Sequence, residues 1–251
     1  MIIPAPDFKQ PPNKDIKTWR YMDYTKFVWM LTSNQLHFPR ADRLGDPFEG
    51  SWPKPNVEQR TGMFEQLGVK DPEAASGAMS DLARRLRKYI YVSCWHAGVD
   101  ESAAMWKIYA ESGKGIAIQT TFKRLYDVLH AVPRKIFLGK VQYLDYQHDY
   151  TPWVGALSPY MRKRKSFEHE QEIRAIIQNA PESWGLSSSD AADEGTEEGL
   201  TISVSLHDLI ETVYVAPQSP GWFHVLVDRT CRKYDLSKPV RQSTLDEDPF
   251  F

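Results

Sequence analysis

The sequence has few cysteines, lacks a long apolar run and carries almost no net charge. Cys94 and Cys231 are its only cysteines, which excludes a disulfide scaffold and favours a reducing compartment. No apolar stretch approaches the roughly 18 residues that a membrane span needs. The 31 Lys and Arg residues nearly balance 33 Asp and Glu residues. A net charge of -2 therefore gives no global electrostatic argument for nucleic-acid binding.

The N-terminal stretch MIIPAPDFKQPPNKD also lacks the features of a targeting segment. It has no basic segment followed by an apolar core, so we expect no signal peptide and a soluble, cytoplasmic protein. Its prolines predict an extended arm over residues 1–15. The remaining chain is long enough to bury a core, and we expect a single domain over residues 16–251.

Predicted helices and strands are mixed along the chain without a regular βαβ alternation. Strands are expected near residues 19–21, 35–38, 89–95, 115–121, 135–144, 170–177, 201–205, 212–216 and 240–243. Helices are expected near residues 27–34, 71–88, 100–113, 122–132, 150–165 and 221–234. Residues 180–199 are acidic and rich in Ser and Gly, which predicts a mobile surface loop. The pattern favours an α+β fold with a mixed, largely antiparallel sheet flanked by helices.

The stretch KRKSFEHEQEIRAII, residues 163–177, is the strongest candidate for a functional strand. If residues 170–177 are extended, Glu170, Glu172 and Arg174 share one face, and apolar side chains line the other. Two carboxylates and a guanidinium on an apolar-backed strand suit an active site. A solvated strand face with cross-strand ion pairs has the same pattern, so spacing alone leaves both interpretations open.

Six stretches occur in an order that resembles the uncharacterised bacterial domain family DUF-2971. They are WRYMDY, LHFPRADRLGDPFEG, YVSCW, SAAMWKIYAESGKGIAI, FEHEQEIR and LIETVYVAP, followed by a closing strand that ends at Ser243. The resemblance covers roughly residues 17–245. The chain departs from the family at Trp95, where Phe is usual, and in the acidic insertion at 180–199. The family has no established activity, so this resemblance implies fold and kinship rather than function.

The order of Arg20, Ser93 and the Glu170–Glu172 pair is similar to the arginine–serine–glutamate layout of ADP-ribosyltransferases. That resemblance implies a cleft that holds NAD as substrate, with Arg20 and Ser93 fixing phosphate and ribose. Arginine suits this role because its planar fork matches phosphate oxygens. A glutamate would accept the ribose hydroxyl and stabilise an oxocarbenium-like transition state. The fold would then be ADP-ribosyltransferase-like.

The expected activity is ADP-ribosyl transfer or NAD glycohydrolysis, as in a bacterial toxin or defence effector, with no metal. The expected catalytic residues are Glu172 and Glu170. Aromatic rings such as Tyr91, Trp106 and Tyr109 are candidates for stacking on nicotinamide. The residues expected to bind substrate are Arg20, Tyr21, Ser93, Trp106, Tyr109 and Arg174.

Three alternatives remain open on the sequence. Cys94 is a candidate nucleophile with His96 as base, although a Cys in YIYVSCW is typical of a buried position. Glu170, Glu172 and Asp46 together would suit the divalent ion of a nuclease. A non-catalytic sensor would use the aromatic cleft and the Arg174 face to bind a nucleotide or a partner protein. The GDPFE turn itself, residues 45–49, is interpreted as a plain turn.

Overall fold

The computed structural model describes residues 1–110, 113–179, 198–247 and 249. The predicted acidic loop therefore falls outside the described residues over 180–197. Its predicted last residue, Gly199, is described and begins a strand.

A seven-stranded sheet forms the centre of the molecule, and it confirms the predicted α+β class with a largely antiparallel sheet. Its order is β11-β10-β4-β1-β3-β8-β5. Only the β10–β11 pair is parallel among the neighbouring strands of this sheet. The strands are β1 (Lys17–Asp23), β3 (Ile90–Ala97), β4 (Gly115–Thr121), β5 (Phe137–Lys140), β8 (Glu172–Gln178), β10 (Thr212–Val215) and β11 (Val240–Gln242).

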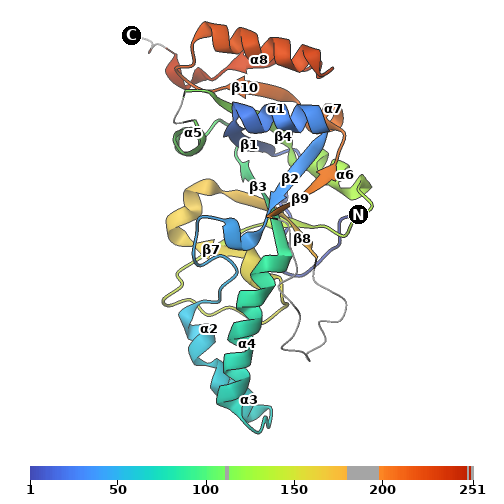
Figure 1. Ribbon diagram of the computed structural model, residues 1–251. Helices are drawn as coiled ribbons and strands as arrows, with labels where there is room; N and C mark the ends of the chain where they lie inside the picture. Colours follow the sequence, from blue (N-terminus) through green and yellow to red (C-terminus); the bar gives the residue numbers. More distant parts are fainter. Residues whose placement is uncertain (111–112, 180–197, 248, 250–251) are drawn as a thin grey trace.

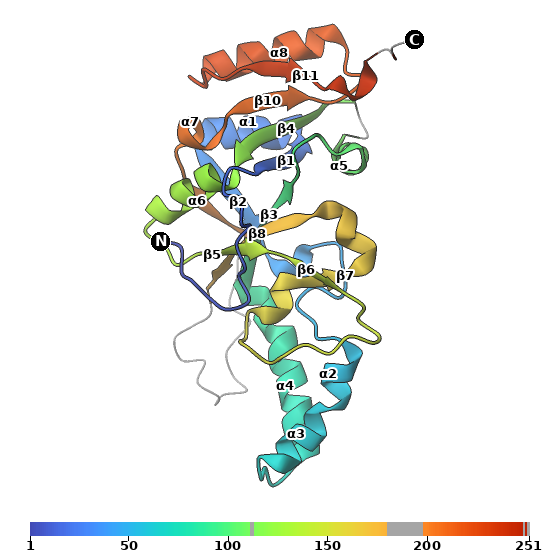
Figure 2. The same ribbon diagram turned by 180° about the vertical axis from the view of Figure 1, so that it is seen from behind.

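The sheet is split between β1 and β3. Their register joins only Thr18 to Ala97 and Trp19 to His96. Beyond these pairs β1 continues beside β4 as far as Asp23, whereas β3 continues beside β8. Figures 1 and 2 show the consequence: β11, β10, β4 and β1 lie in the upper part of the molecule, β8 and β5 lie in the lower part, and β3 connects them.

Two small sheets complete the strand set. β2 (Gln35–Pro39) pairs antiparallel with β9 (Gly199–Ser203), and β6 (Gln142–Leu144) pairs parallel with β7 (Arg162–Arg164). The single strand predicted over 135–144 is thus two strands, β5 and β6. The helix predicted near 150–165 is wrong. Residues 150–157 form no helix, and only the short 3-10 helix η3 (Ser158–Met161) precedes the basic run, which pairs with β6 and then enters the 3-10 helix η4 (Lys165–Glu170).

The start of β8 also differs from the prediction. Gln171 adopts a left-handed backbone conformation with φ +40°, which separates η4 from the strand. Glu170 therefore lies in η4, and the predicted alternation of side chains holds for Glu172 and Arg174 only.

Helices cover the sheet as their apolar spacing requires. α1 (Tyr24–Ser33), α6 (Phe122–Ala131), α7 (Leu206–Leu209) and α8 (Gly221–Lys233) contribute to the main core with side chains such as Phe27, Phe122, Leu209 and Phe223. α5 (Ala103–Tyr109) packs Trp106 against Trp19 and Tyr21 on the opposite face of β1. α2 (Lys54–Glu58), α3 (Arg60–Gln66) and α4 (Pro72–Leu86) project from the lower part (Figure 1). No described helix combines the length and apolarity required to cross a membrane.

The first 15 residues run along the lower sheet without forming a helix, and a single bridge joins Ile2 to Ile136. Ile2 and Phe8 are nevertheless buried. Gly139 permits this packing, because a Cβ at Gly139 would lie 2.7 Å from the backbone of Phe8.

Asp23 is the last residue of β1 and the N-cap of α1, so replacing it tests how the chain passes from the strand to the helix. Its carboxylate accepts a hydrogen bond of 2.8 Å from the backbone N–H of Lys26. We predict that Asp23→Ala lowers the free energy of unfolding by about 1 kcal/mol, because the helix loses its N-cap. Asp127→Ala is the control, since this exposed α6 carboxylate only pairs with Lys123 on the surface (2.6 Å) and should change stability by less than about 0.5 kcal/mol. Equal losses in urea unfolding would contradict the capping role.

Candidate functional site

A cavity of about 760 Å³ opens where β1 and β3 diverge. Its walls come from β1, α1, β2, the segment after β2, β3 and the end of α5. The lining residues are Arg20, Tyr21, Met22, Thr25, Lys26, Trp29, Met30, Gln35, His37, Pro39, Leu44, Val92, Cys94 and Tyr109. A cavity of this size is typical of small-molecule sites.

Arg20 crosses the gap between the two halves of the sheet. Its Nη1 donates to Ser93 Oγ on β3 (3.2 Å), and its Nη2 donates to the carbonyl of His37 on β2 (2.8 Å). The guanidinium also lies over the ring of Trp95, 5.5 Å from its centroid. Arg20, which lies on β1, is therefore held in one orientation by contacts with β2 and β3, and it presents a fixed cation to the cavity.

The cavity is electropositive. Arg20, Lys26 and His37 line it, and none of the lining residues within the described ranges is Asp or Glu. Burial, and then the charges of Arg20 and Lys26, lower the pKa of His37, so its ring is neutral at neutral pH. Two permanent cations facing a space without a carboxylate favour an anionic ligand.

Aromatic side chains supply the apolar part of the wall. Trp29 and Tyr109 are 40% and 43% exposed, so ring surface is available at the cavity mouth. Burial of its phenol, and then neighbouring groups led by Cys94 and Glu170, raise the pKa of Tyr109 to about 12. Tyr109 is thus protonated at neutral pH and can donate a hydrogen bond to a ligand.

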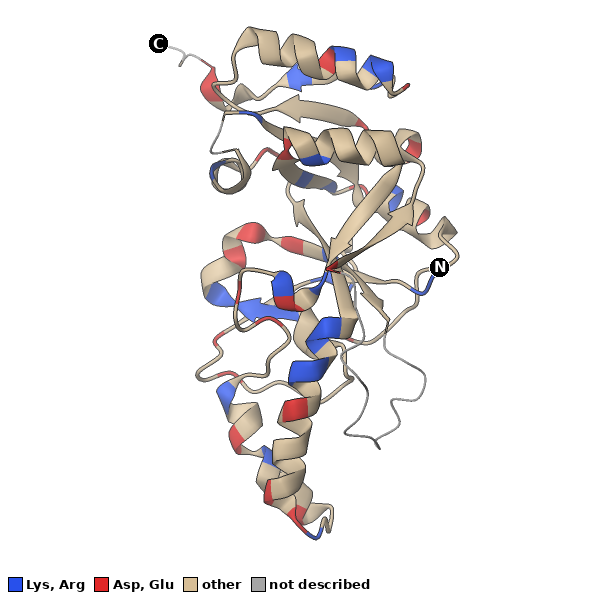
Figure 3. Ribbon diagram, viewed as in Figure 1, with Lys and Arg blue, Asp and Glu red and all other residues tan. Residues whose placement is uncertain are grey.

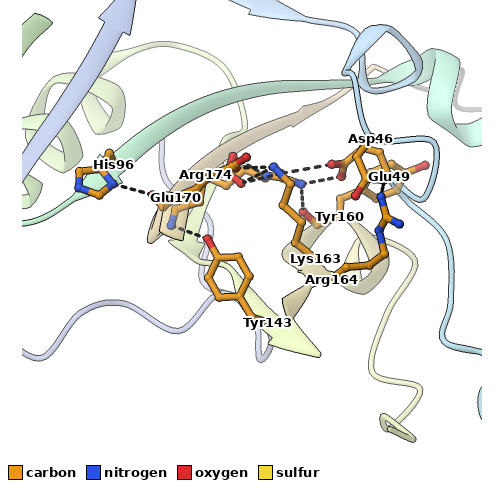
Figure 4. A network of polar contacts seen from close by, with 10 residues as sticks. Asp46, Glu49, His96, Tyr143, Tyr160, Lys163, Arg164, Glu170 and Arg174 are labelled. Atoms are coloured by element: carbon orange, nitrogen blue, oxygen red, sulfur yellow. Dashed lines mark hydrogen bonds and ion pairs between the residues drawn. The ribbon is translucent and has the colours of Figure 1, made fainter. Parts of the chain in front are cut away.

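A buried ion network lies beside this cavity and is centred on Arg174. Its Nη1 and Nη2 donate to the two carboxylate oxygens of Glu49 (2.6 and 3.3 Å), and its Nε and Nη2 donate to Glu172 (3.2 and 2.8 Å). The Tyr160 carbonyl accepts a further bond from Nη1 at 2.5 Å. The Arg174 side chain has no exposed surface. Figure 4 shows how the turn after η1 and the segment before β7 converge on this strand residue.

Lys163 extends the network toward the end of η4. Its ammonium pairs with Glu170 and lies 3.7 Å from the Glu172 carboxylate. The backbone N–H of Glu172 donates to the hydroxyl of Tyr143 (2.8 Å), and the carbonyl of Glu170 contacts Nδ1 of His96 (2.7 Å) (Figure 4). Lys163 of β7 therefore contacts both candidate catalytic carboxylates, while His96 of β3 and Tyr143 of β6 hold the backbone that carries them.

The two carboxylates that share Arg174 have opposite pKa shifts. At Glu172 burial acts to raise the pKa, but Arg174 and then Lys163 outweigh it and lower the pKa. At Glu49 burial outweighs the attraction of Arg174 and raises the pKa. Lys163 lies 3.7 Å from Glu172 and helps to lower its pKa, whereas at Glu49 the charge of Glu172 adds to the effect of burial.

Cys94 separates the ion network from the cavity. It pairs in register with Arg174, so its side chain lies on the face of the β3–β8 pair that carries Glu172 and Arg174, and it lines the cavity that contains Arg20. Burial, and then the charge of Glu172, raise the pKa of the Cys94 thiol well above its usual value. Cys94 is therefore a neutral thiol at neutral pH, which disfavours the alternative in which it acts as a nucleophile with His96.

The structure brings together part of the predicted substrate set. Arg20, Tyr21 and Tyr109 line one cavity, whereas Ser93 does not line it and is linked to it only by its hydrogen bond with Arg20. Trp106 lies behind the wall, where its ring meets Tyr21 edge-on at 4.9 Å and its Nε1 donates to a carboxylate.

Glu170, Glu172 and Arg174 do not line the cavity and lie behind its wall. Glu172 and Arg174 are buried, so Arg174 is placed to hold Glu172 rather than to touch a ligand directly. Glu170 is half-buried at the end of η4.

Sequence reasoning missed the part of the cavity that α1 and β2 provide. Lys26 and Trp29 are one helical turn apart, and His37 follows on β2. The spacing of Lys26 and Trp29 was the only available signal, and it is typical of any exposed helix face. Glu49, in the GDPFE turn interpreted as a plain turn, is a buried ion partner.

The carboxylates considered for a divalent ion are engaged with cations. Asp46 pairs with Arg164 (2.8 Å), Glu170 pairs with Lys163, and Glu172 pairs with Arg174. Within the described ranges, no group of three or more His, Cys, Asp or Glu side chains is arranged to hold a metal. The paired carboxylates give no positive argument for a nuclease.

Comparisons of the chain with models of known protein families, with curated proteins and with solved structures found no match. Its site is therefore interpreted from its own geometry.

The ion network makes a strong prediction about stability. Arg174→Ala should lower the free energy of unfolding by about 3–5 kcal/mol, because Glu49 and Glu172 are left buried without their cation. Arg124→Ala is a matched control: this arginine is partly exposed and pairs with Glu211 at 3.2 Å, so the cost should be under about 1 kcal/mol. Urea unfolding measures both values. Similar losses for the two variants would show that the buried network is not a dominant constraint.

Proposed function

We propose that the protein binds NAD in the cavity between β1 and β3 and cleaves its nicotinamide–ribose bond, passing ADP-ribose to an acceptor or to water. One observation carries the proposal. Arg20, hydrogen-bonded to Ser93, lines the same cavity as Cys94, and Cys94 pairs in register with Arg174, the strand neighbour of Glu172 on the same face of β8. Arg20 thus contacts Ser93 directly, whereas Glu172 lies on the other face of the β3–β8 pair, behind Cys94.

Binding of NAD would use the charge and the rings of the cavity. The pyrophosphate is anionic and suits the oriented fork of Arg20, with Lys26 as a second cation. The exposed ring faces of Trp29 and Tyr109 suit stacking of the adenine or the nicotinamide. The Tyr109 hydroxyl, kept protonated by its raised pKa, is a donor for a ribose oxygen or the carboxamide.

Cleavage would break the bond between ribose C1′ and the nicotinamide nitrogen. Nicotinamide leaves with the bonding electron pair and becomes neutral, and positive charge develops on the ribose ring. Glu172 stays ionised because its pKa is lowered, so it can stabilise that charge and accept a hydroxyl hydrogen bond. The acceptor oxygen or water then bonds to C1′ and loses its proton, for which Glu170 is the available base. The Cys94 thiol must rotate away from Glu172 as the ribose enters.

A second candidate function is a non-catalytic nucleotide sensor. It is favoured by the ion pairing of both carboxylates, since Glu172 contacts Arg174 and Glu170 contacts Lys163. A ligand in the cavity would then bind without being cleaved. The main proposal includes kinship with DUF-2971, which the order of the motifs supports. It also includes a role as a toxin or defence effector, which the proposed NAD chemistry supports.

Arg20 tests the binding half of the proposal. We expect Arg20→Gln to weaken NAD binding by about 10- to 100-fold, because a charge-assisted contact to phosphate is worth roughly 1.5–3 kcal/mol. Arg124→Gln, which removes a partly exposed arginine of α6, should leave the affinity unchanged. Isothermal titration measures both. Undetectable binding of NAD to the wild type would contradict both the enzyme and the NAD-sensor interpretations.

Glu172 tests the chemical half. Wild-type protein incubated with labelled NAD should release nicotinamide, and Glu172→Gln should abolish release while NAD binding remains. Glu168→Gln, on the exposed side of η4, serves as the control and should keep full activity. Cys94→Ala should retain activity, because the thiol is not the nucleophile. Binding of NAD by the wild type without any release would favour the sensor, and full activity in Glu172→Gln would disprove the role of this carboxylate.

The toxin role has its own test. Expression of the wild type in bacteria should arrest growth, and expression of Glu172→Gln should not. Equal growth of cells with either form would count against a toxic role.

A further inference from the structure

Basic side chains gather where the end of α4 meets the segment after β2. The 3-10 helix η2 (Arg87–Tyr89) continues α4 and packs against the 3-10 helix η1 (Ala41–Arg43). Figure 3 shows basic segments at the upper end of α4 and on η1, close to each other in the middle of the molecule. We name this group the basic belt; its members are Arg43, Arg84, Arg85, Arg87 and Lys88.

The belt carries an excess of positive charge despite the nearly neutral chain. Residues 84–88 read RRLRK, with four cations and no acid. The acidic contacts of the belt include Asp81, which pairs with Arg84 (2.6 Å), and Glu198, which pairs with Arg43 (3.0 Å). All four of these side chains are more than half exposed, so such pairs contribute little and exchange readily for another anion.

Arg85 adds to the available donors. Arg85 is exposed. Arginine-rich surfaces suit phosphate groups better than a diffuse lysine patch does, because each guanidinium donates two parallel bonds.

The belt lies next to the proposed NAD cavity. Pro39 and Leu44, which flank η1 on either side, line that cavity. An extended anionic chain on the belt would thus pass the cavity mouth, where the partly exposed rings of Trp29 and Tyr109 lie.

We propose that the basic belt binds the phosphate backbone of a single-stranded nucleic acid. A flexible strand can follow the belt from α4 to η1, and its bases can stack on rings at the cavity mouth. The role of this strand as an ADP-ribose acceptor rests on the proposed function. Strand binding itself does not, and it is measured without NAD.

The test uses the full chain and a fluorescein-labelled oligothymidine of about 16 nucleotides. Fluorescence anisotropy measures the affinity for this strand at salt concentrations from about 50 to 200 mM. The belt variant is Arg43→Gln, Arg84→Gln and Arg85→Gln combined, which changes three exposed residues. It should bind more weakly, and the slope of log affinity against log salt should fall by about 2, at roughly 0.7 for each lost phosphate contact.

The matched control removes the same charge from α8, through Arg229→Gln, Arg232→Gln and Lys233→Gln, which are also exposed. It should keep the wild-type affinity and slope. Thermal unfolding of each variant confirms that it is folded, and titration with NAD should give wild-type affinity for the belt variant. If the wild type binds the oligonucleotide but does not bind NAD, the proposed function is overturned and the belt proposal still stands.

Three results would overturn the belt proposal. The first is no binding of the oligonucleotide by the wild type at about 50 mM salt. The second is an equal loss in the belt and α8 variants, which indicates non-specific attraction. The third is equally tight, belt-dependent binding of poly-glutamate of matched charge, which indicates an acidic protein partner instead.

Discussion

The buried contact of Arg174 with Glu49 and Glu172 is the constraint on which the candidate site depends. An unpaired charge in this interior would cost several kcal/mol, so the GDPFE turn, the segment that carries Tyr160 and β8 must stay together. The same contact fixes the direction of Glu172 and keeps it ionised beside Cys94. The network thus contributes both to stability and to the geometry of the site. Because a structural role alone would account for these buried carboxylates, their presence does not identify a reaction.

The split in the sheet supplies the space that this network borders. β1 and β3 share two residue pairs and then diverge, and the gap is closed by side chains rather than by a backbone ladder. Arg20 crosses that gap through Ser93 and His37. A fixed guanidinium, two exposed rings and an ionised carboxylate behind a neutral thiol form a site suited to a ligand that is anionic at one end and aromatic at another.

Local patterns allowed much of the fold to be predicted, and long-range contacts account for the rest. α1, α4 and α8 follow from apolar spacing and from caps such as Asp23 and Asp71. The sequence of β7 predicts a helix, because its partner β6 lies about 20 residues earlier in the chain and only the folded structure brings the two strands together. β8 begins later than predicted because Gln171 adopts a left-handed conformation. Arg20 and Tyr109 could be proposed from residue type and order. The contributions of α1 and β2 could not, since only tertiary packing brings them to the same cavity.

A crystal structure of the Glu172→Gln variant with NAD bound would test the central claim most directly. The account predicts the pyrophosphate on the Arg20 guanidinium, the nicotinamide ribose next to residue 172, and the Cys94 side chain rotated away from that residue. NAD bound outside the gap between β1 and β3, or with its ribose away from residue 172, would contradict it.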